Sequence, residues 1–221
     1  MTKIRFEHVT KQIKGITVLA DISLTLEGGQ VYGLFGGNGS GKTMFLRAIA
    51  GLIRPTQGYV MIDEQQLHKD MRFPKSIGVL IETPDFWKNY TGREVLIYLS
   101  EIKKQISHND VDVALKRVGL NPSDTRTIRK YSLGMKQRLG IAQAIMENPD
   151  ILLLDEPSNA LDKTGKEMLM QIIHEEAKKG HIVVLASHND SDLKICDTII
   201  EIADGKVEEI RENENKAKIS H

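Results

Sequence analysis

Several glycines, a lysine and a threonine lie together in one eight-residue segment, Gly36-Gly37-Asn38-Gly39-Ser40-Gly41-Lys42-Thr43. Glycine lets the backbone take conformations that other residues avoid, so the chain can approach a ligand closely and point successive N–H groups at an anion. The ammonium group of Lys42 adds positive charge, and the hydroxyl of Thr43 is a suitable Mg²⁺ ligand. The segment therefore predicts a cradle for a chain of phosphates and its magnesium ion.

The spacing of this segment matches the P-loop pattern G-x-x-x-x-G-K-[ST] without a gap. Apolar residues 31–35 precede it as a predicted buried strand, and residues 43–50 have the spacing of a helix. Such a helix would direct its positive end at the phosphates. We therefore predict a nucleotide-binding loop that consists of Gly36, Gly37, Asn38, Gly39, Ser40, Gly41, Lys42, Thr43 and Met44.

Two carboxylates and a histidine follow two further apolar stretches. Asp155 and Glu156 come directly after residues 151–154, and His188 comes shortly after residues 182–186. Because parallel strands of an α/β sheet end at one edge, these side chains should meet where phosphate and Mg²⁺ would lie. We predict Asp155, with the Thr43 hydroxyl, as a metal ligand. Glu156 is the predicted base that aligns the attacking water, and His188 and Lys42 complete the predicted catalytic set.

The elements that position these residues suggest an α/β fold. Alternating apolar residues near the start predict antiparallel strands, a middle stretch has helical periodicity, and strand and helix patterns then resume. Expected strands are 4–9, 21–26, 31–35, 59–62, 151–154 and 182–186, expected helices 43–50, 94–105, 110–118 and 164–179, and an expected hairpin covers 198–210. The predicted domains are a core of residues 1–85 and 146–221, an inserted helical subdomain of 86–145, and a frayed tail of 212–221.

Composition limits the classes of function. The 221 residues include 30 basic and 30 acidic side chains, so the net charge gives no argument for a nucleic-acid surface, and we expect no nucleic-acid partner. The single cysteine, Cys196, lies in an apolar run and is expected to be buried and inert. No apolar run approaches the ~20 residues of a membrane span, so we expect a cytoplasmic protein that reaches a membrane only through a partner.

A second motif narrows the choice among P-loop proteins. Residues 131–138, Tyr-Ser-Leu-Gly-Met-Lys-Gln-Arg, resemble the L-S-G-G-Q signature of ABC ATPases with its basic-Gln-Arg continuation. Residues 156–162 look like the family's catalytic glutamate and D-loop, His188 matches its switch histidine, and the resemblance covers about residues 4–210. It implies a P-loop NTPase core with an N-terminal antiparallel β subdomain and an inserted α-helical subdomain.

The resemblance also implies how such a protein works. Two ATPase subunits, identical or paralogous, would pair head to tail, with each ATP and Mg²⁺ between the P-loop of one and Ser132 and Gly134 of the other. The helical subdomain would pass the motion to a separate transmembrane permease subunit, which would hold the protein at the inner face of the cell membrane. The alternative is a soluble ABC-type ATPase that transports nothing, for example in cofactor assembly.

Three positions depart from the family pattern. Ile13 lies where many members have an aromatic residue that stacks on adenine, so base affinity or selectivity is expected to be weaker. Glu82 replaces the usual glutamine of the Q-loop and remains a possible Mg²⁺ ligand. Leu133 and Met135 replace a glycine and the glutamine of the signature. We still expect an active site, because the predicted catalytic residues are retained.

The combination Ile-Glu-x-Pro-x-Phe, from residue 81, with Ser-Leu-Gly-Met-Lys-Gln-Arg looks like a bacterial exporter subgroup. That subgroup includes ATPases for bacitracin-type and lantibiotic-type peptides. Three aromatic residues follow Glu82, and they either contact a membrane partner or pack the helical subdomain onto the core. Phe86 is the better candidate for the partner contact, and Trp87 is the candidate for the core. The sequence specifies neither the cargo nor whether the pair is a homodimer.

Overall fold

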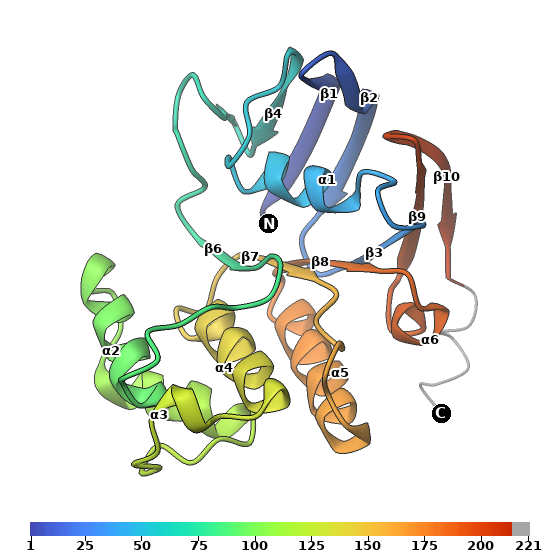
Figure 1. Cartoon of the computed structure of the whole chain (residues 1–221). Helices are drawn as coiled ribbons and strands as arrows, with labels where there is room; N and C mark the ends of the chain where they lie inside the picture. Colours follow the sequence, from blue (N-terminus) through green and yellow to red (C-terminus); the bar gives the residue numbers. More distant parts are fainter. Residues whose placement is uncertain (214–221) are drawn as a thin grey trace.

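The computed structural model describes residues 1–213 and contains two β-sheets with helices packed on them (Figure 1). The larger sheet has the strand order β10-β9-β3-β8-β7-β6, in which only the pairing of β9 with β10 is antiparallel. Its strands are β3 (Val31–Phe35), β6 (Ile77–Leu80), β7 (Ile151–Asp155), β8 (Ile182–Ser187), β9 (Thr198–Ala203) and β10 (Lys206–Glu212). All residues of β7 and β8 are buried, as their apolar runs predicted for strands covered on both faces.

The smaller sheet is antiparallel and has the order β2-β1-β4-β5. Its strands are β1 (Lys3–Ile13), β2 (Ile16–Glu27), β4 (Gln57–Ile62) and β5 (Gln65–Gln66). The expected N-terminal antiparallel subdomain is thus confirmed, but β1 and β2 are longer than the predicted strands. Shifts of register interrupt their pairing between Phe6 and Lys11, so the alternation of apolar residues that marks a strand is broken there.

Helix α1 (Lys42–Ile49) lies between the two sheets (Figure 1). Its buried side chains share one hydrophobic cluster with residues of β1, β2, β7 and β8. The rings of Phe6 and Phe45 stack within it, 4.5 Å apart between centroids. Burial on both sides fixes the start of α1, and therefore the glycine-rich loop, against the larger sheet.

The remaining helices cover the other face of the larger sheet (Figure 1). They are α2 (Gly92–Lys103), α3 (His108–Arg117), the short 3₁₀ helix η1 (Ile128–Lys130), α4 (Leu133–Ile145), α5 (Lys163–Lys178) and α6 (Asp190–Leu193). Along both β7 and β8, successive side chains alternate between two hydrophobic clusters, one beneath these helices and the other around α1. This alternation is expected of strands covered on both faces. One continuous hydrophobic cluster joins α2 and α3 through α4 to β7, β8 and α5. The expected boundaries at 85/86 and 145/146 stay a prediction.

Helices α2 and α3 each begin two residues before the predicted 94 and 110, and they end two residues and one residue before the predicted 105 and 118. Each begins with a capping box, in which two side chains accept hydrogen bonds from each other's backbone N–H groups. The two residues are Thr91 and Glu94 in α2, and Ser107 and Asp110 in α3. A capping box satisfies N–H groups that have no partner inside the helix, so it sets the first residue more firmly than apolar periodicity does.

The end of the described chain corrects one prediction. Strands β9 and β10 form the expected hairpin, but β10 continues to Glu212. Asn213 is buried, and its Nδ2 donates to the carbonyl oxygens of Leu193 and Cys196, each at 3.0 Å. The predicted tail is therefore wrong at residues 212 and 213, and its remainder, 214–221, lies outside the described residues. Cys196 is buried, as predicted.

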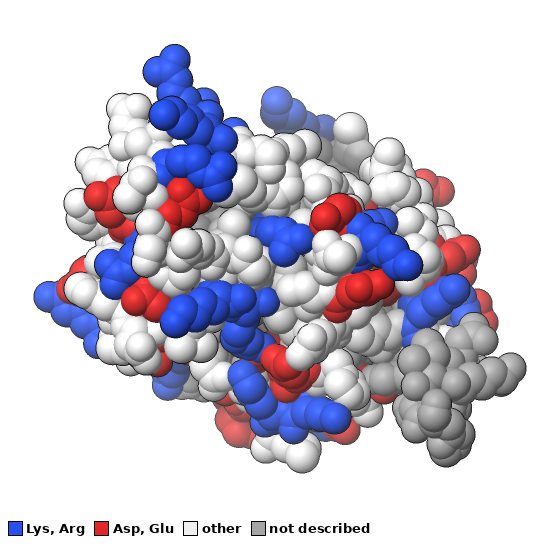
Figure 2. Space-filling model, turned by 90° about the horizontal axis from the view of Figure 1, so that it is seen from below, with Lys and Arg blue, Asp and Glu red and all other residues white. Residues whose placement is uncertain are grey.

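The outer face of the helical layer is mixed in charge. Figure 2 shows this face from below, with lysine and arginine side chains interspersed among aspartate and glutamate. The view agrees with the equal counts of basic and acidic residues. Within residues 1–213, none of the helices is both long and apolar enough to span a membrane.

Candidate nucleotide-binding site

The glycine-rich loop joins the end of β3 to the start of α1, as predicted. Gly41 is the N-cap of α1 and has φ of 114°, a conformation that side chains disfavour. At Gly36, a Cβ atom would lie 2.2 Å from the carbonyl oxygen of Ile202. Both positions therefore require glycine for the loop to keep its path between the strand and the helix.

The ammonium group of Lys42 lies within this loop. Its Nζ donates to the carbonyl oxygens of Gly36 at 2.7 Å and Gly37 at 2.9 Å, and only 7% of the residue is exposed. The helix start adds its own positive end at the same place. The loop therefore presents a fixed positive charge that suits the terminal phosphates of a nucleotide.

Asp155 ends β7 and accepts a hydrogen bond from Thr43 Oγ1 at its Oδ2, at 2.6 Å. Burial raises the pKa of Asp155, and the nearby carboxylates of Glu156 and Glu82 raise it further, while the Thr43 bond and Lys42 act in the opposite direction. A divalent cation would relieve this accumulation of negative charge. Because Mg²⁺ is held by one or two protein oxygens together with phosphates and water, Thr43 and Asp155 fit it.

Glu156 and His188 meet at the carboxyl-terminal ends of the strands. Glu156 Oε1 lies 2.7 Å from His188 Nδ1 and also accepts from the backbone N–H of His188 at 3.1 Å. Its other oxygen, Oε2, is buried without a partner. Among residues 1–213, the only other such side-chain atom is Ser40 Oγ in the glycine-rich loop. Because buried polar atoms normally have partners, both atoms indicate that this site binds something more.

Glu82 lies just beyond β6 and forms an ion pair with Arg47 of α1. Arg47 was not predicted, although it lies four residues after Thr43 and thus on the same face of α1. Glu82 has φ of 66°, which is uncommon for residues other than glycine. Because β6 pairs in parallel with β7, with Leu80 opposite Leu154, Glu82 lies at the edge of the sheet where Asp155 ends β7, and its carboxylate helps to raise the pKa of Asp155.

A cavity of about 510 Å³ contains most of these groups. Residues 38–44 of the loop and helix, together with Asp155 and Glu156, line one part of it. The tip of the β1–β2 hairpin lines the other part with Ile13, Lys14, Ile16 and Val18. Ile13 was expected here, but Ile16 and Val18 were missed because the second strand was predicted to start at Asp21. The alternation of apolar residues from Ile16 onward could have revealed them.

The signature residues lie apart from this cavity. Ser132 is the N-cap of α4, where its Oγ accepts from the backbone N–H of Met135 at 3.2 Å, and neither it nor Gly134 lines the cavity. Two side chains of α4 connect it to the segment after Glu156. Gln137 Nε2 donates to the carbonyl oxygen of Pro157 at 3.0 Å, and Arg138 pairs with Asp162 at 3.1 Å.

The aromatic residues after Glu82 reverse the expected roles. Phe86 is partly buried against the hydrophobic cluster of the helical layer, whereas Trp87 is 55% exposed. Trp87, Tyr90 and Tyr98 contact one another edge to face, with centroids 5.5–6.3 Å apart. The segment before α2 is irregular, so no periodicity could have indicated which of its rings faces the core.

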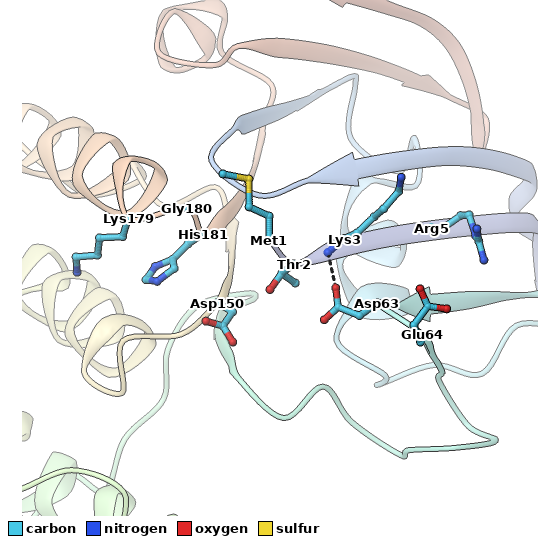
Figure 3. A pocket seen from close by; sticks show the side chains of 10 residues that line it. All are labelled: Met1, Thr2, Lys3, Arg5, Asp63, Glu64, Asp150, Lys179, Gly180 and His181. Atoms are coloured by element: carbon cyan, nitrogen blue, oxygen red, sulfur yellow. Dashed lines mark hydrogen bonds between the residues drawn. The ribbon is translucent and has the colours of Figure 1, made fainter.

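A second hollow, of about 810 Å³, lies at the opposite, amino-terminal edge of the larger sheet (Figure 3). Asp150 and His181, which directly precede β7 and β8, take part in its lining. The other charged side chains in it are Lys3, Arg5 and Lys179, balanced by Asp63 and Glu64. It contains no residue of the predicted site, and its mixed charge does not favour a phosphate ligand.

Comparisons with known proteins agree with this geometry. A protein-family model described as "ABC transporter" matches residues 19–159. The uncharacterized ABC transporter ATP-binding protein YybJ of Bacillus subtilis (strain 168) is 50% identical over 91% of this chain and 93% of its own length. The bacitracin transport ATP-binding protein BcrA of Enterococcus faecalis is 38% identical over 96% of this chain and 70% of its own.

Solved structures extend the comparison to the fold. The dimeric structure of MJ0796, a bacterial ABC transporter cassette, superposes with a TM-score of 0.87 and 27% identity, covering 95% of this chain and 98% of that one. A dimeric post-hydrolysis state of the same cassette, bound to ADP and Pi, has a TM-score of 0.85 and 25% identity, covering 95% and 98% of the two chains.

Proposed function

Because this chain belongs to the ABC transporter family of ATP-binding proteins and is an ATPase, we propose that it hydrolyses ATP between two subunits arranged head to tail and powers export through a separate membrane permease. One observation carries the proposal. Lys42, Thr43, Asp155 and Glu156 line one cavity, while Ser132 is exposed outside that cavity and its Oγ has only a bond within its own helix end. A site divided in this way needs a second subunit to become complete.

Each residue of the cavity has a role in the proposal. Lys42 binds the terminal phosphates, and Thr43 and Asp155 hold the Mg²⁺, which neutralises charge on those phosphates. Glu156 orients the attacking water through its unpartnered Oε2 and accepts the water's proton. His188, which contacts the other carboxylate oxygen, keeps Glu156 in place and lies near the terminal phosphate.

The partner subunit supplies Ser132 and the backbone N–H groups at the start of α4, which favour an anion. Contacts of Gln137 and Arg138 with the segment after Glu156 support coupled movement of the signature helix and the catalytic edge.

The exposed ring cluster of Trp87, Tyr90 and Tyr98 is the proposed contact for the permease. Aromatic residues are favoured at the centre of protein interfaces, and a cluster of three exposed rings is costly to leave in water. The relative named for bacitracin transport, together with the resemblance to the exporter subgroup, supports export of a peptide of the bacitracin or lantibiotic type. Copurification of the full chain with a polypeptide that has several apolar spans would support transport, whereas soluble partners alone would favour the cofactor-assembly alternative.

Mixing two inactive variants tests the head-to-tail arrangement. Lys42→Ala disables the phosphate cradle, and Ser132→Asp keeps an N-cap for α4 but places a negative charge against the phosphate. Each variant alone should lose nearly all ATPase activity. An equal mixture should recover up to about a quarter of the wild-type rate, because half of the dimers are mixed and each has one intact site.

The controls make this result decisive. Each variant should show the wild-type melting temperature within a few degrees, so that loss of activity cannot be assigned to unfolding. Activity of the Ser132→Asp variant alone near the wild-type rate, at any protein concentration, would refute the composite site. If the mixture recovers no activity, the result would count against a head-to-tail dimer whose two composite sites work independently.

A further inference from the structure

Asp192 of α6 is a buried acidic side chain that the proposed mechanism does not use. The residue is 3% exposed, and its Oδ2 accepts hydrogen bonds from Ser158 Oγ at 2.6 Å and from Ser187 Oγ at 3.0 Å. Both serines are also buried. A carboxyl group is costly to remove from water, so an apolar side chain would suit this position better if packing were its only task.

The two serines lie next to the residues of the catalytic edge. Ser158 comes two residues after Glu156, and Ser187 directly precedes His188. Glu156 Oε1 and His188 Nδ1 are in turn 2.7 Å apart. Asp192 therefore closes a ring of contacts between the segment after β7 and the end of β8, and this ring includes both residues of the catalytic edge.

The backbone of Glu156 requires support of this kind. Its φ is 47°, in the left-handed region that residues other than glycine seldom adopt. Such a conformation persists only where the surrounding structure fixes it. On one side, the backbone N–H of Glu156 donates to the carbonyl oxygen of Ala186 at 2.9 Å. On the other side, the bond between Ser158 and Asp192 holds the chain, so its loss would let the Glu156 carboxylate shift within the site.

Helix α6 gives Asp192 a fixed support. Asn189 caps the start of the helix, where its Oδ1 accepts from a backbone N–H of the first turn at 3.0 Å. At the end of the helix, Asn213 Nδ2 donates to the carbonyl oxygens of Leu193 and Cys196. Asp192 itself does not line the nucleotide cavity. It can therefore act on the reaction only through the residues that it holds.

From this ring of contacts we propose that Asp192 is a positioning residue for ATP hydrolysis. Through the hydroxyls of Ser158 and Ser187, it keeps Glu156 and His188 in the geometry that aligns the attacking water. The inference rests on the role of Glu156 in the proposed function. Because the phosphate cradle has no contact in this ring, Asp192 should influence the hydrolytic step and leave nucleotide binding unchanged.

Kinetics of Asp192 variants of the full chain test this role. Asp192→Ala should lower kcat by about 10- to 100-fold, because misplacing a reacting group by about 1 Å has an effect of this size. KM for ATP and the ATP dissociation constant should stay within about threefold, since Lys42 and Thr43 are unchanged. Asp192→Asn should keep kcat within about fivefold of wild type, because its amide oxygen can accept from both serine hydroxyls. Rates are taken per folded molecule, with the folded fraction measured by denaturation.

A double-mutant cycle shows whether Asp192 acts through the serines. Replacing both Ser158 and Ser187 with alanine should lower kcat as Asp192→Ala does, again at constant KM. Adding Asp192→Ala to this pair should lower kcat by less than about threefold more, because the bonds are already absent. The matched control is Glu176→Ala in α5, which also removes a fully buried carboxylate but lies near the opposite edge of the sheet. It should reduce stability and leave kcat per folded molecule within about twofold.

Three outcomes would overturn the inference and leave the proposed function intact, provided that Glu156→Gln still loses turnover. They are a kcat of Asp192→Ala within about threefold of wild type, fully additive losses in the cycle, and an equal loss of kcat in Glu176→Ala. If Glu156→Gln itself turned over ATP at the wild-type rate, the proposed function would fail instead. Should Asp192→Ala not fold, the variant that lacks both serines gives the same test: a loss of kcat at constant KM supports the inference, and no loss refutes it.

Discussion

Two buried carboxylates, Asp155 and Glu176, lie near opposite edges of the larger sheet and are neutralised to very different extents. Asp155, at the carboxyl-terminal edge, has a hydrogen bond from neutral Thr43 and two acidic neighbours, Glu156 and Glu82, whose charges raise its pKa. Glu176, near the end of α5, is fully buried but is surrounded by basic groups. The two sites therefore represent opposite solutions for a carboxylate removed from water.

Both carboxylate oxygens of Glu176 have basic partners from the same chain. Its Oε1 lies 2.9 Å from both Arg117 Nη2 and Lys179 Nζ, and its Oε2 lies 3.0 Å from His181 Nδ1. Burial opposes ionisation of Glu176, but the hydrogen bonds from Lys179 and Arg117 outweigh it and lower its pKa. Because Arg117 comes from α3 and His181 precedes β8, this charge joins three parts of the fold.

The difference separates a structural edge of the sheet from a functional one. At the amino-terminal edge, a buried charge is neutralised by basic partners in the same chain. At the carboxyl-terminal edge, two buried oxygen atoms lack partners, and negative charge accumulates beside Lys42. Buried groups left unsatisfied in this way are expected where a ligand completes the site. Substitutions at the two edges should therefore affect different properties.

The largest effect is expected from Glu156→Gln at the functional edge. The amide keeps the size of the side chain but cannot accept a proton, so turnover should fall by about 10²–10⁴-fold. ATP binding should persist, and the ATP-bound dimer should accumulate. Single-turnover kinetics and size-exclusion chromatography with ATP measure both quantities. A turnover within tenfold of wild type would remove Glu156 from the role of base.

Glu176→Gln should have the opposite pattern. Removing one partner of a buried ion pair leaves Arg117 and Lys179 without a full counter-charge, so the free energy of unfolding should fall by about 3 kcal/mol. The ATPase rate of the remaining folded protein should change little. Chemical denaturation measures the first quantity, and the rate per folded molecule measures the second.

The matched control is Glu175→Gln, one residue earlier on α5. Glu175 also pairs with Arg117, at 2.8 Å, but its side chain is 42% exposed. Exposed ion pairs contribute little, so this variant should lose no more than about 1 kcal/mol. Equal losses for the two variants would show that burial is not what distinguishes Glu176, and the contrast between the two sheet edges would weaken.

Local patterns in the sequence predicted most of the functional edge, because its residues follow short apolar strands or lie within one glycine-rich loop. Lys42, Asp155 and His188 could be placed in this way. The capping box of Thr91 and Glu94 was equally readable, and would have corrected the start of α2. These features depend on neighbours within a few residues, so the spacing of residues in the sequence is sufficient to predict them.

Features that depend on packing between distant segments could not be predicted. The ion pair of Arg47 with Glu82 joins residues 35 positions apart, and that of Arg117 with Glu176 joins α3 to α5. The assignments of Phe86 and Trp87 failed for the same reason, since either ring could have faced the core. A single sequence states which residues are apolar or charged, but not which of them meet across the fold.

The smallest effect, and the sharpest test of the contrast, is expected for Asp155→Asn without nucleotide or Mg²⁺. The amide can still accept the hydrogen bond from Thr43, while the buried charge disappears. The free energy of unfolding near pH 7 should therefore rise by about 1 kcal/mol, since a poorly compensated buried charge is unfavourable. At the structural edge the corresponding Glu176→Gln change has the opposite sign.

The pH dependence of stability gives the same comparison within the wild-type protein. Because the pKa of Asp155 is raised in the folded state, the native protein binds more protons than the unfolded chain as pH increases from the usual aspartate value of 3.8. The contribution of Asp155 to stability therefore falls as pH rises through that window. Carboxylates with a lowered pKa, such as Glu176, contribute in the opposite direction, so the contribution of Asp155 is measured as the difference between wild type and Asp155→Asn. In denaturation curves with a chelator, the stability of wild type relative to the variant should decline from about pH 4 to 7. A difference that does not change with pH, or a variant that is less stable than wild type at pH 7, would mean that the carboxyl-terminal edge already neutralises its own charge and does not depend on a bound cation.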